Sequence, residues 1–103
     1  MAFFPLANLI DLYDGYRQST RIRGVPLLLL QDEGVLYLME NRCPHMDAKL
    51  DTGTVSDGAI TCRAHGIAFQ LKSGRALGPL AGTLECLRFY DLVYDGNKVG
   101  VDL

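Results

Sequence analysis

Short apolar segments alternate with polar turn residues along most of this chain. The segments are rich in Val, Ile, Leu, Phe and Tyr, and Gly, Asp and Asn separate them. None of them keeps a helical period, and segments of this length and composition are typical of β-strands. The strands predicted in this way are Phe3–Ala7, Tyr16–Ile22, Val25–Gln31, Val35–Glu40, Ala59–Thr61, Ile67–Leu71, Leu87–Tyr94 and Lys98–Asp102. The pattern therefore predicts an all-β fold.

The residues between these segments predict tight antiparallel hairpins. Each connection contains a residue that tolerates a positive φ, as two- and three-residue hairpin loops require. These connections are Asp32-Glu33-Gly34, Asp57-Gly58, Lys72-Ser73-Gly74 and Asp95-Gly96-Asn97. With 103 residues and no linker composition or internal repeat, we expect one domain over residues 1–103.

Charge and hydropathy exclude two classes of partner. The formal net charge is −2 and no basic stripe is present, so there is no electrostatic basis for binding nucleic acid. The central apolar run Val25–Leu30 is far shorter than the roughly 20 residues of a membrane-spanning helix. The N-terminus contains Pro5 and lacks the basic start of a secretory signal. We expect a cytoplasmic protein with no membrane partner.

The two histidines of the chain each lie close to a cysteine. The first pair is Cys43-Pro44-His45, and sixteen residues separate it from the second pair, Cys62-Arg63-Ala64-His65. Two thiolates and two imidazoles form a four-ligand set for a borderline metal ion. Structural zinc is one interpretation, although zinc sites commonly pair Cys with Cys and His with His. The mixed pairs favour a two-iron cluster with both thiolates on one iron and both imidazoles on the other.

The motif C-x-H, sixteen residues and C-x-x-H, with Pro44 inside the first element and Gly66 after the second, resembles the Rieske iron–sulfur signature. The resemblance implies a Rieske fold, in which an antiparallel β-sandwich or barrel-like base carries a small cluster-binding subdomain of two loops, here about residues 41–80. It implies one [2Fe–2S] cluster held by Cys43, His45, Cys62 and His65. Pro44, Gly66 and Pro79 match residues that support the cluster loops.

Departures from the high-potential members of this family bear on the redox potential. In respiratory Rieske proteins a disulfide braces the two loops, and serine and tyrosine hydroxyls donate to cluster sulfurs. Ala48 and Ala64 stand at the disulfide positions, Ile67 at the serine and Phe69 at the tyrosine. Without these groups, the resemblance implies a potential near the low end of the Rieske range, roughly −150 mV.

The same resemblance implies a function in electron transfer and no catalysis by the chain itself. An oxygenase needs a second, mononuclear iron site, often with two histidines, and no histidine remains for one. The first hypothesis is a ferredoxin that passes electrons from a reductase to a terminal oxygenase, without a small-molecule substrate of its own. The alternatives are the small Rieske-type subunit of an assimilatory nitrite reductase and a zinc-stabilised interaction module. Candidate partner contacts are His45, His65, Arg42, Lys49 and Arg63.

Cys86 is the cysteine left outside this motif. It lies among apolar residues of the stretch Thr83–Tyr90, which we also expect to form a strand and which overlaps the predicted strand Leu87–Tyr94. A buried cysteine behaves as a small hydrophobe, so we expect Cys86 to pack in the core, with a redox or ligand function as the alternative.

Overall fold

The computed structural model describes residues 2–44, 48–64, 66–78 and 85–103. Its described strands form three small antiparallel sheets. The central sheet has the order β2-β3-β4, the second β1-β9-β8, and the third β5-β6-β7. The elements are β1 Phe3–Asn8, the 3-10 helix η1 Leu9–Asp11, β2 Arg17–Ile22, β3 Val25–Asp32, β4 Val35–Glu40, β5 Thr54–Ser56, β6 Ala59–Thr61, β7 Ala68–Gln70, β8 Val93–Asp95 and β9 Lys98–Asp102. The expected all-β, antiparallel fold class is confirmed.

Two-residue turns set the register of the central sheet and of the third sheet. Arg23-Gly24 joins β2 to β3, Glu33-Gly34 joins β3 to β4, and Asp57-Gly58 joins β5 to β6. All six of these turn residues have a positive φ, between 49° and 80°. Two successive residues with positive φ form the type I′ turn, whose twist matches that of the flanking strands. Local turn chemistry thus fixes which residues face each other in these hairpins.

The second sheet brings the two ends of the described chain together. β1 pairs with β9, and Ala2 and Leu103 exchange two backbone hydrogen bonds of 3.0 and 3.1 Å. Gly100 in β9 is buried, and a Cβ at this position would collide with the carbonyl oxygen of Phe4. The missing side chain is therefore what allows β1 and β9 to approach so closely.

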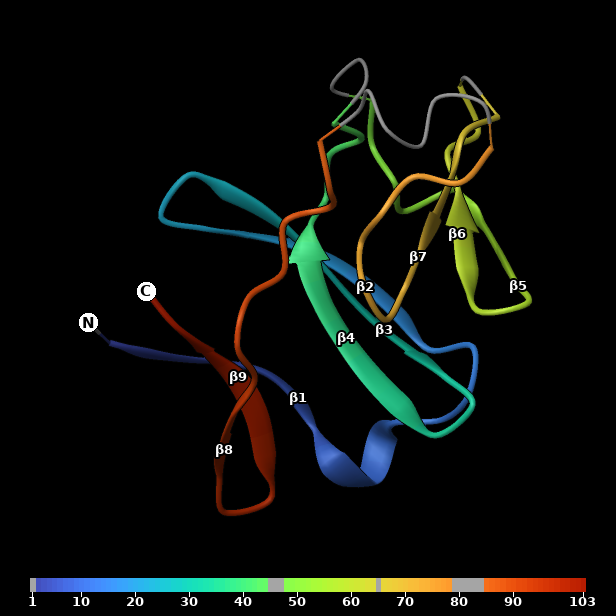
Figure 1. The fold of residues 1–103 in the computed structure, drawn as a ribbon. Helices are drawn as coiled ribbons and strands as arrows, with labels where there is room; N and C mark the ends of the chain where they lie inside the picture. Colours follow the sequence, from blue (N-terminus) through green and yellow to red (C-terminus); the bar gives the residue numbers. More distant parts are fainter. Residues whose placement is uncertain (1, 45–47, 65, 79–84) are drawn as a thin grey trace.

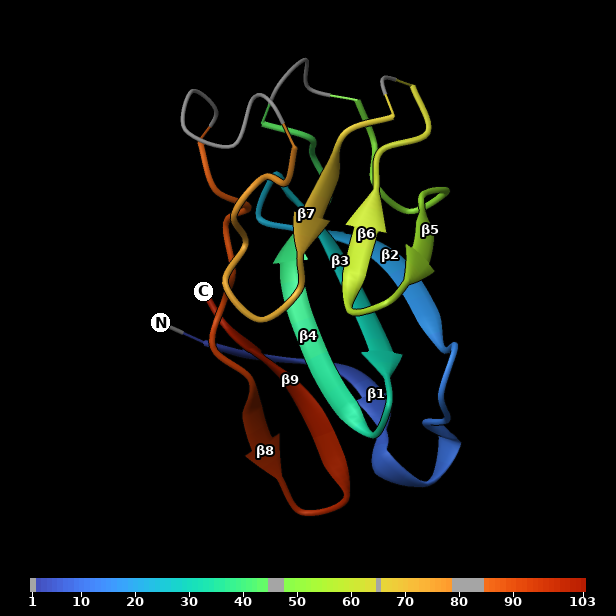
Figure 2. The ribbon, with the colours of Figure 1, turned by 45° about the vertical axis from the view of Figure 1, so that its right-hand side comes forward.

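β3 lies at the centre of two hydrophobic cores because its two faces point to different sheets. Leu28 and Leu30 pack in a core with residues of the third sheet, whereas Leu27 and Leu29 pack with β9. All four leucines are at most 2% exposed. A strand buried on both faces is continuously apolar instead of alternating, which explains the leucine run. The third sheet thus packs on one face of the central sheet and the second sheet packs on the other; the central and second sheets together form the base of the molecule (Figures 1 and 2).

The predicted strand Leu87–Tyr94 is wrong in its extent. Around Phe89 the chain hydrogen-bonds to β4, where the Glu40 N–H donates to Arg88 O and the Tyr90 N–H to Leu38 O, each at 2.8 Å. It then leaves β4 and pairs with β9 as β8. One apolar stretch thus serves two sheets, which its periodicity could not reveal. β5 was missed because Thr54–Ser56 contains a single apolar residue.

The expectation that Cys86 is buried in a strand is also wrong. Its side chain is exposed and lies in no strand, since the chain here runs over the surface beside β4 and buries only Leu87. In the part of the chain that the structure describes, no helix has the length and apolarity to cross a membrane.

Candidate metal centre

The two cysteines of the ligand motif open loops with the same backbone closure. Cys43 follows β4, and its N–H donates to the carbonyl oxygen of Ala48 at 2.7 Å. Cys62 follows β6 directly, and its N–H donates to the carbonyl oxygen of Ile67 at 2.8 Å. In both loops the acceptor lies five positions after the cysteine. The sequence spacing of each Cys–His pair therefore fits inside one tight loop.

Both thiols are buried at the same end of the molecule. Cys43 and Cys62 are each 0% exposed and belong to one core cluster with Leu50, Ile60 and Phe69. The segments that follow them, green and yellow in Figures 1 and 2, emerge together above the third sheet. None of the three cysteines of the chain forms a disulfide. An apolar shell around buried thiolates limits access of water to a bound metal centre.

The second loop turns at Gly66. This residue has a φ of +69°, in the left-handed region that favours glycine, and its N–H donates to the Cys62 carbonyl oxygen at 2.7 Å. Pro44, in the first loop, is half-buried. His45, His65 and Pro79 lie outside the described residues, so the ligand set and the supporting residues stay predictions.

Asn41 is a site residue that sequence reasoning missed. Its side chain is 6% exposed, and its Oδ1 accepts the N–H groups of Leu50 at 2.8 Å and Asp51 at 3.0 Å. These bonds join the segment before the first loop to the segment after it. A single Asn after an apolar strand gives no signal of this role in the sequence.

The basic residues proposed as partner contacts are at the surface. Arg42, Lys49 and Arg63 are all exposed, and Arg42 Nη2 lies 2.9 Å from Glu40 Oε1. Arg42 and Arg63 are next to Cys43 and Cys62 in sequence, and Lys49 follows Ala48, whose carbonyl oxygen closes the first loop. Their position is compatible with contact to a partner.

The four positions expected to tune the potential differ in burial. Phe69 is fully buried, Ala48 and Ile67 are half-buried against the same core, and Ala64 is exposed. None of these side chains carries a hydrogen-bond donor, so none can stabilise added negative charge on a cluster sulfur.

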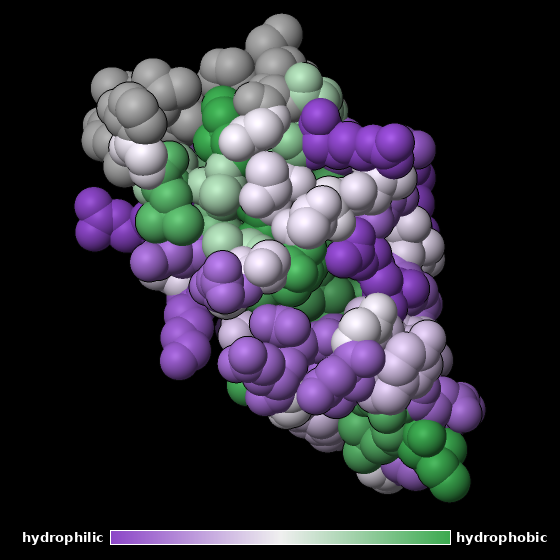
Figure 3. Space-filling model, turned by 90° about the vertical axis from the view of Figure 1, so that its right-hand side faces the viewer, coloured by the Kyte–Doolittle hydropathy of each residue, from purple (hydrophilic) through white to green (hydrophobic). Residues whose placement is uncertain are grey.

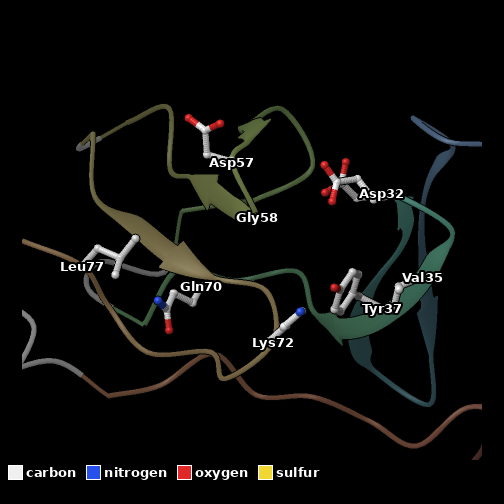
Figure 4. A pocket seen from close by; sticks show the side chains of 9 residues that line it. Asp32, Val35, Tyr37, Asp57, Gly58, Gln70, Lys72 and Leu77 are labelled. Carbon is white, nitrogen blue, oxygen red and sulfur yellow. The ribbon is translucent and has the colours of Figure 1, made fainter.

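A pocket lies away from the ligand loops, between the β3–β4 hairpin and the third sheet. It has a volume of about 460 Å³, and Asp32 and Tyr37 on one side face Asp57 and Lys72 on the other (Figure 4). Burial, and to a smaller extent the charges of Asp32 and Glu33, raise the pKa of Tyr37. Neither cysteine lines this pocket. On this side of the molecule hydrophilic residues alternate with hydrophobic ones (Figure 3).

The donor chemistry and the loops fit a two-iron centre. Two buried thiols lie in matched loops within one core cluster, and each loop also contains one histidine in the sequence. A Rieske centre requires this combination, with two thiolates for one iron and two imidazoles for the other.

Comparison with known proteins decides the family. The model of the Rieske [2Fe-2S] domain matches residues 2–88. The chain belongs to the Rieske [2Fe–2S] family. Its cofactor is one [2Fe–2S] cluster, so the zinc interpretation is set aside.

Several of the proteins that this chain resembles are ferredoxins of dioxygenase systems. The chain is 28% identical over 95 residues to the naphthalene 1,2-dioxygenase system ferredoxin component of Pseudomonas aeruginosa, covering 92% of this chain and 89% of that protein. The solved ferredoxin of carbazole 1,9a-dioxygenase from Nocardioides aromaticivorans IC177 has a TM-score of 0.81 at 25% identity, covering 98% of this chain and 97% of that one. A ferredoxin solved in complex with the oxygenase of carbazole 1,9a-dioxygenase has a TM-score of 0.81 at 23% identity, covering 96% and 91%, and so shares the fold.

Proposed function

We propose that this Rieske protein is the ferredoxin of a multicomponent oxygenase system, which accepts one electron from a reductase and delivers it to a terminal oxygenase. The observation that carries the proposal is the end-to-end similarity to a dioxygenase ferredoxin component, which covers about nine-tenths of both chains. The two buried cysteines in matched loops agree with it. The nitrite reductase alternative is not favoured by these relatives.

We further propose that Cys43 and Cys62 bind one iron and that His45 and His65 bind the other. When bound, the cluster supplies a one-electron redox couple. The chain keeps the two thiols out of water and holds them in loops closed by backbone hydrogen bonds. Pro44, Gly66 and Pro79 are proposed to support these loops, and residues 41–80 to form the cluster-binding part of a single domain.

The partner surface is proposed to be the end of the molecule where the two loops emerge. The exposed cations Arg42, Lys49 and Arg63 lie near the two cysteines in sequence, and His45 and His65 of the ligand motif are proposed as further contacts. Charges at the rim of a transient interface accelerate association and orient the partners more than they add affinity. A carrier that must release its partner after each transfer suits such an interface. We place the protein in the cytoplasm, where reductases and oxygenases of this kind would meet it.

The cysteines provide a matched test of the ligand assignment. Cys43→Ser and Cys62→Ser should each abolish the Rieske absorption and lower the iron content, because a thiolate ligand is lost. Cys86→Ser changes an exposed cysteine outside the motif and should retain two iron and two labile sulfide per chain. His45→Ala and His65→Ala should also lose the Rieske spectrum. Wild-type protein that holds one zinc and no iron would refute the assignment.

Electron delivery is tested by reconstitution. The purified protein, reduced by a flavin reductase of a naphthalene dioxygenase system, should reoxidise when the matching terminal oxygenase is added, with rates that fall as the salt concentration rises. Its midpoint potential should lie near −150 mV, the low end of the Rieske range. Stable copurification with a large nitrite reductase subunit would contradict the shuttle, and a potential well above 0 mV would contradict the assignment of Ala48, Ala64, Ile67 and Phe69.

A further inference from the structure

The segment 50–53, which we call the strap, connects the first cysteine loop to β5 and is held from the base of the molecule. At its start the strap is bound by Asn41, whose Oδ1 accepts hydrogen bonds from the N–H groups of Leu50 and Asp51. Asn41 itself is fixed to the base, since its N–H donates to the carbonyl oxygen of Pro26 at 2.9 Å. The strap is thereby tied to a residue two positions before Cys43.

Arg17 of β2 binds the strap from another direction. Its Nη1 donates to the carbonyl oxygens of Asp51 at 2.8 Å and Gly53 at 2.6 Å. Ser19, two positions along β2, donates through Oγ to Asp51 Oδ2 at 3.1 Å. Residues two apart on a strand share a face, so Arg17 and Ser19 reach the strap together. Hydrogen bonds from a charged donor are stronger than neutral ones.

Gly53 places the strap against the second cysteine loop. It is buried, and a Cβ there would lie 2.5 Å from the carbonyl oxygen of Thr61 and 3.2 Å from Ile60 Cγ1. Thr61 is the residue that precedes Cys62. Only a residue without a side chain allows this approach, so the strap contacts the backbone at the root of the second loop.

We infer that Arg17 is a positioning residue, which acts through the strap to hold the two cysteine loops at a fixed distance from each other and from the base. The contacts form a continuous path from Arg17 to Gly53 and Thr61, and from Asp51 to Asn41. No disulfide is available at Ala48 and Ala64 to do this. The inference rests on the proposed ligands Cys43 and Cys62, but the path itself is independent of the cluster.

Arg21 provides a matched control on the same strand. It is exposed, and its Nη1 donates to the Gly24 carbonyl oxygen at 3.0 Å within its own hairpin. Arg17→Met and Arg21→Met thus remove the same charge and the same kind of donor from β2, and only the first reaches the strap. Arg17→Lys keeps the charge and a donor and serves as the conservative variant.

The measurements are hydrogen exchange of the holoprotein by mass spectrometry, the electron paramagnetic resonance spectrum of the reduced protein, and the rate of cluster release in mild denaturant. For Arg17→Met we expect about tenfold faster hydrogen exchange, confined to the strap, and about tenfold faster release of the cluster, because charge-assisted hydrogen bonds are lost. The lines of the electron paramagnetic resonance spectrum should broaden and their g-values should shift. Arg21→Met should stay within about twofold of wild type by the same criterion. Arg17→Lys should fall between Arg17→Met and wild type.

Two outcomes would overturn the inference. In one, Arg17→Met matches Arg21→Met in all three measurements. In the other, exchange rises equally over the whole chain with unchanged g-values, which identifies Arg17 as a general stabiliser of β2. If Arg17→Met does not fold, the test uses Arg17→Lys. Hydrogen exchange and g-values of Arg17→Lys that equal those of the wild type would then refute the inference. A wild-type protein without iron would refute the proposed function, whereas exchange at the strap would still test the role of Arg17.

Discussion

Replacing Asn41 by alanine should destabilise the first cysteine loop by about 2–4 kcal/mol. The substitution leaves the N–H groups of Leu50 and Asp51 without their acceptor. An unsatisfied buried donor costs about 1–3 kcal/mol. Leu50 is fully buried and bears the full cost, whereas the half-buried Asp51 can recruit water for part of it. The loss is a large fraction of the roughly 5–15 kcal/mol that stabilises a domain.

Local hydrogen exchange is the appropriate assay because proteins with a tightly bound cluster do not unfold as simple two-state systems. A loss of 2–4 kcal/mol corresponds to about 30- to 1,000-fold faster exchange at the amides of Leu50 and Asp51. Asn97→Ala, the same change at an exposed turn position, is the control and should leave these amides unchanged. If Asn41→Ala exchanges within about threefold of wild type at both amides, the two hydrogen bonds do not hold the loop.

Three further predictions test other parts of the fold. Phe69→Tyr places a hydroxyl at the fully buried position from which high-potential Rieske proteins donate a hydrogen bond to a cluster sulfur. The midpoint potential should rise by about 40 mV, since this bond stabilises the more negative, reduced cluster by about 1 kcal/mol more than the oxidised one. Phe89→Tyr, at the surface, should leave the potential unchanged, and an unaltered potential in Phe69→Tyr would refute the reasoning. Gly100→Ala should lower the melting temperature by at least about 5 °C, because its Cβ would collide with a carbonyl oxygen of β1, while the spectrum of the cluster stays the same. Hydrogen bonds from the Gln31 side chain and the Gly34 N–H lower the pKa of Asp14 from its ordinary 3.8. The stability that these bonds give to the folded protein is therefore complete above pH 3.8 and is lost as the pH falls through the lowered pKa. An NMR titration of the Gly34 amide with its midpoint above 3.8 would contradict this.

Much of the local structure could be predicted because it depends on residues that are neighbours in the chain. The hairpin turn Glu33-Gly34 and the turn Asp57-Gly58 carry the residues that a positive φ requires, and the structure has hairpins there. The resemblance carried by the two Cys–His pairs implied two loops, and the loops that begin at Cys43 and Cys62 close over the same number of residues. The run Leu27–Leu30 identified a buried strand without showing that its two faces serve different cores.

The failures concern residues whose environment is set from far away. Cys86 has apolar neighbours and yet is exposed, because the chain around it lies on the surface beside β4. The stretch from Leu87 onward changes partner from β4 to β9, and no period in its sequence marks the change. Burial and pairing here depend on which other strands are adjacent, and that information is absent from a local window.

The sequence alone determined which chemical groups this Rieske protein offers to its cluster: two Cys–His pairs supply the thiols and imidazoles of the predicted ligand set. Turn residues and strand patterns predicted the hairpins next to them. Tertiary structure alone decided how the two loops are held. Arg17 binds carbonyl oxygens 34 and 36 residues away, and Gly53 lies against Thr61 because no Cβ stands between them. Backbone carbonyls are identical at every position, so only folding of the sheets selects which of them a side chain meets.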